Sequence, residues 1–263
     1  MLNKTILGNE NLPKLALIHG WGAQNAVWQD WAKDYLADYY QLHLIELPGF
    51  GRSAGVDNQD SDQVLAQNWI DEIVAAMPEN THLLGWSLGG LLAQQIAIQH
   101  PEKVASLICL ASTPRFTQND DWKWAVSPKL MADFMHSVQA DSIATLKSFW
   151  TLQMQGSDMP RVQIRQFVKR MQDYQIPKLS GLTQGLRLLK HFDFRDQAGE
   201  LTMPVLWLLG EHDPLIPQAF ISEFSTIQRQ AEVQILEGAA HTPFASHPQQ
   251  TADAIRHFLA KLN

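Results

Sequence analysis

The stretch THLLGWSLGGLLAQQIAIQHP, residues 81–101, carries the strongest structural signal in the chain. Its short apolar run at 81–86 predicts a buried strand, and the longer run at 88–100, stopped by a proline, predicts a helix. Between them, GWSLG matches the pattern G-x-S-x-G, in which small residues permit a tight strand-to-helix turn that lifts the Ser87 hydroxyl above the sheet. This strand–motif–helix context favours a nucleophilic serine over the alternative, a plain glycine-rich turn.

Similar apolar runs on both sides of this stretch alternate with longer amphipathic segments. The expected strands are 15–20, 41–47, 81–86, 104–111, 203–210 and 231–238. The expected helices are 27–39, 61–77, 88–100, 217–229 and 248–261. Strand–helix alternation at this spacing is typical of βαβ units, so we predict an α/β fold with a mostly parallel central sheet flanked by helices.

The alternation stops between residues 114 and 195. This segment shows helical patterns with many aromatic, methionine and basic residues, and no convincing strand. The simplest arrangement is a core made of residues 1–113 and 196–263, with 114–195 inserted as a helical cap over one edge of the sheet.

The composition excludes several classes of protein. The chain has 263 residues, a formal net charge of −7 and 45% hydrophobic residues, which disfavours a general binder of nucleic acid or of anionic membranes. Its apolar runs are shorter than the roughly 20 residues that span a bilayer, and the N-terminus lacks a signal-peptide pattern. The single cysteine, Cys109, lies in an apolar run and reads as a buried strand residue rather than a reactive thiol. We expect a cytoplasmic protein.

The charge is unevenly distributed. Residues 114–195 contain 12 Lys and Arg against 7 Asp and Glu, a net charge of +5, while the rest of the chain carries −12. An acidic partner would be attracted to the cap and repelled elsewhere.

A serine nucleophile needs a histidine base and an acid that orients it, and after this type of turn the acid precedes the histidine in the chain. Asp213 follows the expected strand 203–210, and His241 follows the expected strand 231–238. Both therefore belong at the sheet edge where Ser87 emerges. Glu211 is an alternative acid, and His212 and His247 are alternative bases. An ordinary loop residue is the remaining alternative at each position.

The segment HGWG at 19–22 follows the first expected strand. Its glycines would let the backbone N–H of Trp21, together with that of Leu88, form an oxyanion hole. His19 could act as a base, but we expect it to brace the loop through a hydrogen bond. Catalysis of this kind needs no cofactor. The sequence has no cluster with metal-ligand spacing, and the GFG run at 49–51 lacks the third glycine of a dinucleotide site.

The motifs together resemble the α/β-hydrolase superfamily, on GWSLGG, HGWG and the Asp213–His241 pair. The resemblance narrows to the carboxylesterase family of biotin synthesis, which hydrolyses the methyl ester of pimeloyl-acyl-carrier protein. The segments that carry it, nearly end to end, are LIHGWG, ELPGFGRS, LGWSLGGLLAQQIAIQHPEKV, ASTPRF, FWTLQMQG, GLRLLKHFDFR and GAAHTPFASHP. GWSLGG and HGWG are shared by many hydrolases, whereas PGFGRS and FWTLQMQG are more discriminating.

The resemblance implies roles for individual residues. It implies Ser87 as nucleophile, His241 as base and Asp213 as orienting acid. It further implies substrate contacts at these positions: Trp21, Ser87, Leu88, Phe149, Trp150, Thr151, Leu152, Gln153 and His241. Of the cap segment, we choose Phe149 and Trp150 to line an acyl channel.

Basic cap residues hold the acidic carrier protein in that family. Arg161 and Arg165 fall on matching positions and would share one face of a helix, although a solvated helix face is the alternative. Two other basic positions of the family are Ala144 and Ser148 here, with Lys147 beside them.

We therefore expect a monomeric serine carboxylesterase that acts on the methyl ester of a carrier-bound dicarboxylic acyl chain. One alternative is a carboxylesterase of broad specificity for short chains. The other is a binding protein for the carrier or a small ligand that has lost catalysis.

Overall fold

The computed structural model describes residues 1–59, 61–224 and 228–262 and is built on a seven-stranded sheet in the order β1-β3-β2-β4-β5-β6-β7. Neighbouring strands are parallel except β1, which runs antiparallel to β3. The strands are β1 Lys4–Leu7, β2 Lys14–Ile18, β3 Gln41–Ile45, β4 Thr81–Trp86, β5 Val104–Leu110, β6 Val205–Gly210 and β7 Glu232–Leu236. The predicted α/β class with a mostly parallel sheet is confirmed.

Strands β2 to β7 occupy the six predicted positions, but β1 was not predicted. It is four residues long, lies at the sheet edge and alternates between exposed and half-buried side chains. Strands β2, β4, β5 and β6 are buried almost throughout, because helices cover both faces of a parallel sheet. Cys109 lies fully buried in β5, and this burial raises the pKa of its thiol, as expected for a structural residue.

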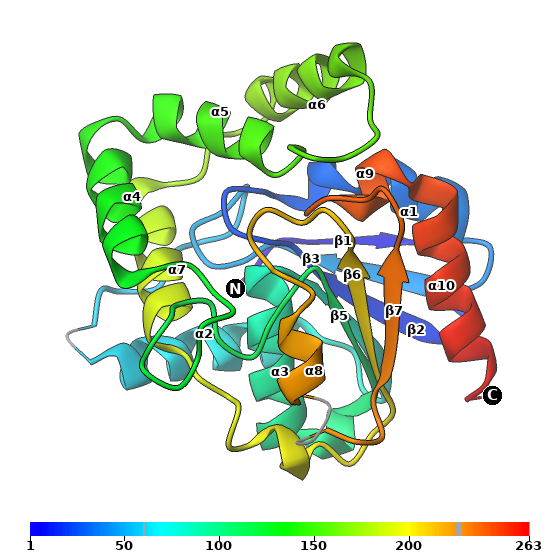
Figure 1. Ribbon diagram of the computed structural model, residues 1–263. Helices are drawn as coiled ribbons and strands as arrows, with labels where there is room; N and C mark the ends of the chain where they lie inside the picture. The colour runs from blue at the N-terminus through cyan, green and yellow to red at the C-terminus, as the bar shows by residue number, and fades with distance from the viewer. Residues whose placement is uncertain (60, 225–227, 263) are drawn as a thin grey trace.

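Helices pack against both faces of the sheet, with α1 and α10 on one face and α2 and α3 on the other (Figure 1). The α-helices of the core are α1 Gln29–Leu36, α2 Asp62–Ala76, α3 Leu88–Gln99, α8 Phe220–Phe224, α9 Pro243–Ser246 and α10 Pro248–Ala260. Short 3₁₀ turns cover η1 Asn25–Val27, η2 Pro101–Lys103 and η3 Ala198–Glu200. Among the described residues, none of the helices is long and apolar enough to cross a membrane.

The helix predicted at 217–229 is wrong in extent. Helix α8, described over Phe220–Phe224, begins only at Phe220, because Pro217 introduces a turn in which its carbonyl accepts the Phe220 N–H, and residues 228 and 229 are not helical. Residues 225–227 lie outside the described part of the chain.

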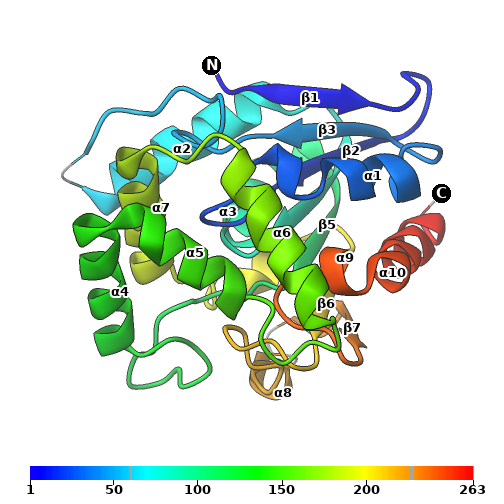
Figure 2. The same cartoon turned by 90° about the horizontal axis from the view of Figure 1, so that it is seen from above.

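Between β5 and β6 the chain forms the cap helices α4 Pro128–Ala140, α5 Ser142–Leu152, α6 Arg161–Asp173 and α7 Leu179–His191. Figure 1 places α5 and α6 beyond the arrowheads of β6 and β7, and Figure 2 shows the cap helices from above. Residues 115–126 form a loop with isolated bridges, so the helical pattern expected over 114–195 does not extend to this part of the segment. The boundaries of the cap at 114 and 195 stay a prediction.

Candidate active site

Ser87 occupies the turn between β4 and α3 with a backbone φ of +55° and ψ of −116°. A positive φ is costly for a residue with a side chain, so the surroundings must hold it. The Ser87 N–H donates to the Leu110 carbonyl at 3.0 Å, and the Ser112 hydroxyl donates to the Ser87 carbonyl at 2.9 Å. Glycine is required beside the serine because a Cβ at Gly89 would lie 2.1 Å from the Ile18 carbonyl oxygen.

Ser87, His241 and Asp213 form a continuous chain of hydrogen bonds. His241 Nε2 lies 2.9 Å from Ser87 Oγ, and His241 Nδ1 lies 2.8 Å from Asp213 Oδ2. The side chains of His241 and Asp213 are fully buried. The carboxylate accepts the Nδ1 proton, which leaves Nε2 free to accept the proton of the serine hydroxyl. This arrangement can activate the serine as a nucleophile.

The loop after β6 orients Asp213 through its second carboxylate oxygen. Oδ1 accepts the backbone N–H groups of Leu215 and Ile216 at 2.8 and 3.0 Å, so both oxygens have partners. These bonds leave Oδ2 directed at His241, which gives the acid a defined orientation.

The alternative acid and bases lie away from this chain of hydrogen bonds. Glu211 Oε2 accepts the Gly238 N–H and lies 3.7 Å from His212 Nε2, and both side chains are exposed. His247 Nδ1 is hydrogen-bonded to the hydroxyl of its neighbour Ser246. The geometry therefore brings Asp213 and His241, rather than these residues, to the serine.

The HGWG loop lies at the carboxyl end of β2, with Gly20 packed against Ser87 and Trp86. His19 is fully buried, and its Nδ1–H donates to the Gly20 carbonyl at 2.8 Å while Nε2 accepts the Leu47 N–H at 3.1 Å. His19 therefore braces the loop, as expected, and is not a base for the serine.

Burial lowers the pKa of His19 to about 4, and the hydrogen bond to Gly20 only partly opposes this effect. Between pH 6.5 and 4 the unfolded chain therefore binds a proton that the folded chain excludes. The folded state loses stability as the pH falls through this range.

Two of the backbone N–H groups near the serine that have no acceptor within the described part of the chain are those expected to form the oxyanion hole. They belong to Trp21 and to Leu88, the first residue of α3, where a helix leaves its N–H groups unpaired. The Trp21 indole is occupied elsewhere, because its Nε1–H donates to the Leu182 carbonyl at 2.9 Å. The two free N–H groups are available to an oxyanion.

An apolar cavity of about 120 Å³ lies above Ser87. Its lining residues are Trp21, Ser87, Phe116, Val126, Leu130, Met131, Phe134, Phe149, Leu152, Leu186, Leu189 and Leu215. The sequence had assigned Trp21, Ser87, Phe149 and Leu152 to substrate contact. The other lining residues were missed, because an apolar residue on a cap helix gives the same pattern whether it faces a cavity or the core.

The remaining predicted contacts in the cap point elsewhere. Trp150 is buried, and its Nε1–H donates to the Gly22 carbonyl at 2.9 Å. Gln153 is also buried, and its backbone carbonyl accepts the His241 N–H at 3.0 Å. Thr151 faces an outer groove. Trp150 and Gln153 thus contact the catalytic loops and are absent from the cavity lining.

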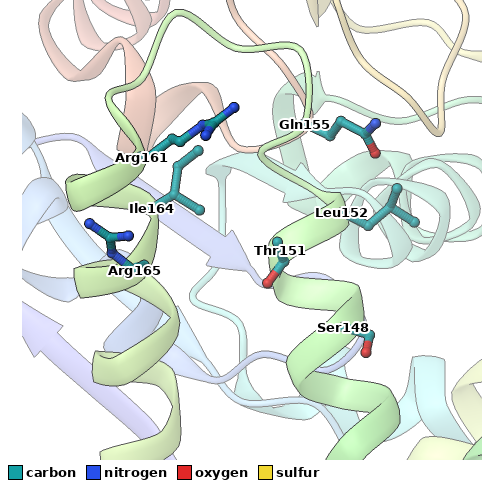
Figure 3. Close-up of a pocket in the computed structure, with 7 residues that line it drawn as sticks. All are labelled: Ser148, Thr151, Leu152, Gln155, Arg161, Ile164 and Arg165. Atoms are coloured by element: carbon teal, nitrogen blue, oxygen red, sulfur yellow. The ribbon is translucent and has the colours of Figure 1, made fainter.

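That outer groove, of about 550 Å³, lies between α5 and α6 (Figure 3). Its lining residues are Ser148, Thr151, Leu152, Gln155, Arg161, Ile164 and Arg165. Leu152 lines both the groove and the apolar cavity, so the two hollows meet at this side chain. Lys147 lines a different hollow with Trp150 and Ile176, and it therefore does not join the two arginines.

Some basic residues of the cap pair with carboxylates, as Lys129 does with Asp133, and others do not. Arg115 and Arg195 pair with Asp193, and Arg187 pairs with Asp62. By contrast, Arg161 and Arg165 are exposed and make no ion pair with any carboxylate of the described residues. Their positive charge is therefore not neutralised within the chain.

Groups of three or more His, Cys, Asp or Glu side chains that could hold a metal ion do not occur among the described residues.

Comparison with known proteins gives consistent matches. The family described as the alpha/beta hydrolase fold matches residues 13–248. The pimeloyl-[acyl-carrier protein] methyl ester esterase of Aeromonas hydrophila is 40% identical over 248 residues, covering 94% of this chain and 95% of the relative. The protein of the same name from Yersinia pseudotuberculosis is 35% identical over 244 residues, covering 93% and 92%.

Solved structures agree on the fold. An esterase from Exiguobacterium antarcticum has a TM-score of 0.83 at 20% identity, covering 99% of this chain and 95% of its own. A bromoperoxidase from Bacillus anthracis has a TM-score of 0.84 at 17% identity, covering 98% and 95%. At these identities the likeness concerns the fold alone.

Proposed function

The chain belongs to the α/β hydrolase family and, within it, to the pimeloyl-[acyl-carrier protein] methyl ester esterases, and on that premise we propose that it hydrolyses the methyl ester of a carrier-bound pimeloyl chain in biotin synthesis. It is a carboxylic ester hydrolase. The observation that carries the proposal is the hydrogen-bonded Ser87–His241–Asp213 chain at an apolar cavity that meets a groove lined by two unpaired arginines.

The proposed reaction is acyl transfer to water through an acyl-enzyme. His241 Nε2 takes the Ser87 proton as Oγ attacks the ester carbonyl, and the N–H groups of Trp21 and Leu88 stabilise the oxyanion. The protonated histidine then donates its proton to the departing methoxy group, which leaves as methanol. A water activated by His241 releases the free carboxylic acid by the same steps.

The apolar lining favours the neutral ester over the product. Leucine and phenylalanine side chains offer no partner to a carboxylate, the indole N–H of Trp21 already donates to the Leu182 carbonyl, and burying an unpaired charge is costly. Hydrolysis creates that charge, so the product should leave readily. Because a carrier protein is too large to enter the cavity, the bond that reaches Ser87 is the distal methyl ester, at the far end of the acyl chain.

The cap supports binding of an acidic carrier protein. Arg161 and Arg165 lie one turn apart on α6 and face the groove that joins the cavity at Leu152 (Figure 3). A carrier docked there would have its acyl chain directed from the groove into the cavity. We also propose that the enzyme acts as a monomer in the cytoplasm.

Mass spectrometry of the intact carrier protein tests the proposal. After incubation with the enzyme, we expect the methyl-ester-loaded carrier to lose one methylene unit of mass, with the acyl chain still attached. The Ser87→Ala variant should leave the mass unchanged. Loss of the whole acyl chain would show cleavage of the thioester and refute the proposal.

A carboxylesterase of broad specificity for short chains is the second candidate, since the cavity of about 120 Å³ also suits a small free ester. Comparing kcat/KM for p-nitrophenyl esters and for the carrier-bound ester separates the two. A preference for the free ester that does not change with salt would favour the second candidate.

A non-catalytic binding protein makes a different prediction. A fluorophosphonate should label Ser87 in the active enzyme, and folded protein that resists labelling would indicate that catalysis has been lost.

A further inference from the structure

Helix α5 makes direct hydrogen bonds to both halves of the catalytic machinery. Near its end, the Trp150 indole donates to the Gly22 carbonyl of the HGWG loop at 2.9 Å. Immediately after the helix, the Gln153 carbonyl accepts the backbone N–H of His241 at 3.0 Å. One helical turn of the cap thus lies between the oxyanion loop and the catalytic base.

The contact with the oxyanion loop is close and specific. Gly22 adopts a φ of +74°, and a Cβ there would lie 2.9 Å from Leu146 Cδ2 of α5. The loop therefore packs directly against the helix at this glycine. Gly22 follows Trp21, whose N–H is the proposed oxyanion donor. A shift of the Gly22 carbonyl would therefore reorient the adjoining backbone, including that donor.

The contact with the base is equally direct. The backbone of His241 is held from two sides, because its N–H donates to Gln153 and its carbonyl accepts the Trp86 indole N–H at 2.8 Å. The first partner belongs to the cap, and the second belongs to the strand that carries the nucleophile. The cap is therefore needed to complete the support of the histidine.

Helical spacing separates this function from substrate binding. Leu146 and Trp150 are buried four residues apart, which places them on one face of α5, and Gln153 follows the helix as its C-cap. Ser148 and Thr151 line the outer groove on another face (Figure 3).

We propose that α5 is a positioning brace, in which Trp150 holds the oxyanion loop and the Gln153 carbonyl holds His241 at a set separation. Trp150 is then a positioning residue, and its effect is on the transition state rather than on substrate binding. This inference rests on the ester-hydrolase chemistry of the proposed function and does not depend on the carrier protein.

The test compares Trp150→Phe with Trp122→Phe. Trp122 is a matched control, because it is another buried cap tryptophan and its indole N–H donates to a backbone carbonyl, that of Arg115, at 3.1 Å. Each variant keeps an aromatic ring and loses one hydrogen bond, so similar shifts in melting temperature are expected. Only Trp150 donates to a catalytic loop.

We expect Trp150→Phe to lower kcat for a p-nitrophenyl ester roughly 10-fold, the order of effect of one lost buried hydrogen bond, with KM within about twofold of the original value. The rate of fluorophosphonate inactivation at saturating reagent should fall in parallel, since the phosphonyl oxygen occupies the oxyanion position. Trp122→Phe should leave both rates unchanged.

Three results would overturn the inference. A rise in KM with kcat unchanged would make Trp150 a substrate contact, and equal rates in the two variants would remove its positioning role. If circular dichroism shows that Trp150→Phe does not fold, Leu146→Ala gives the test, because it removes the α5 side chain that packs on Gly22 and should also lower kcat without changing KM. An unchanged kcat in that variant would refute the brace.

The outcome is independent of carrier recognition. If the original enzyme hydrolyses p-nitrophenyl esters but not the carrier-bound ester, the proposed substrate is wrong while the comparison of tryptophan variants still reports on the brace.

Discussion

Reversing the charge of Arg161 and Arg165 should weaken carrier binding without harming catalysis. Both side chains are exposed and unpaired at the outer groove, and neither is hydrogen-bonded to the Ser87–His241–Asp213 chain. We therefore expect the Arg161→Glu/Arg165→Glu variant to raise KM for the carrier-bound ester and to keep kcat. Its kcat/KM for a p-nitrophenyl ester should be unchanged.

The size of the expected rise in KM follows from the solvent exposure of the Arg161 and Arg165 side chains. An exposed ion pair contributes about 0.2–1 kcal/mol, and reversal replaces attraction by a repulsion of similar size. Two reversals therefore cost about 2 kcal/mol, which corresponds to a roughly 30-fold rise in KM at low ionic strength. Salt screens exposed charges over a Debye length of about 10 Å at 0.1 M, so the difference from the original enzyme should shrink as salt is added.

Steady-state kinetics with both substrates, at several salt concentrations, measures this effect. Lys14→Glu/Lys33→Glu is the control, because it changes the net charge equally at residues outside the cap. A similar rise in KM in the control would mean that overall charge, not the groove, attracts the carrier. An unchanged KM in the Arg161/Arg165 variant would refute docking at the groove.

Three further predictions concern the triad, the cavity and acid stability. Asp213→Asn should lower kcat about 10⁴-fold, because an amide no longer favours the Nδ1–H tautomer of His241. A decrease of less than about tenfold in steady-state kinetics would contradict this. Phe149→Ala should raise KM for the carrier-bound ester, because Phe149 lines the cavity. It should also lower the free energy of unfolding in urea by about 2 kcal/mol, because the Phe149 ring packs on that of Trp21 with the ring centroids 5.1 Å apart. An unchanged KM would place the acyl chain elsewhere. Because burial lowers the pKa of His19 to about 4, the free energy of unfolding should decrease by about 3 kcal/mol as the pH falls from 6.5 to 4. His19→Gln should make the free energy of unfolding less dependent on pH in this range. An equally steep decrease in the variant would assign the pH dependence to other groups.

Local pattern and sheet topology together predicted the position of the triad. The turn at Ser87 is encoded within a few residues, since glycine at 85 and 89 is required by contacts with the adjacent backbone. Asp213 and His241 lie far away in the chain, but each directly follows a parallel strand. Because parallel strands end at one edge of the sheet, their convergence on the serine could be expected before the structure was known.

The same reasoning failed where the signal was short or depended on distant partners. Strand β1 has only four residues and is held by pairing with β3, about 40 residues later, so its sequence carries too little pattern to identify it. The helix expected at 217–229 was too long because Pro217 permits a turn before Phe220.

The segment 149–153 shows the limit of a resemblance. Its residues were grouped as substrate contacts, yet a helix turns each side chain by about 100° relative to the last. Phe149 and Leu152 therefore line the cavity, Thr151 faces the groove, and Trp150 and Gln153 reach the catalytic loops.

The sequence by itself determined the α/β class, the turn at Ser87 and the order of the catalytic residues, because these depend on short-range steric requirements and on hydrophobic periodicity. It also gave the cap a net charge of +5. Only the tertiary structure decided which of those charges are free, since Asp62, Asp121 and Asp193 neutralise Arg115, Arg187 and Arg195 but leave the groove arginines unpaired. It likewise placed the Trp150 indole on the oxyanion loop. Ion pairs and hydrogen bonds act over a few ångströms in space, between residues that the chain can separate by more than 100 positions, such as the 128 between Trp150 and Gly22.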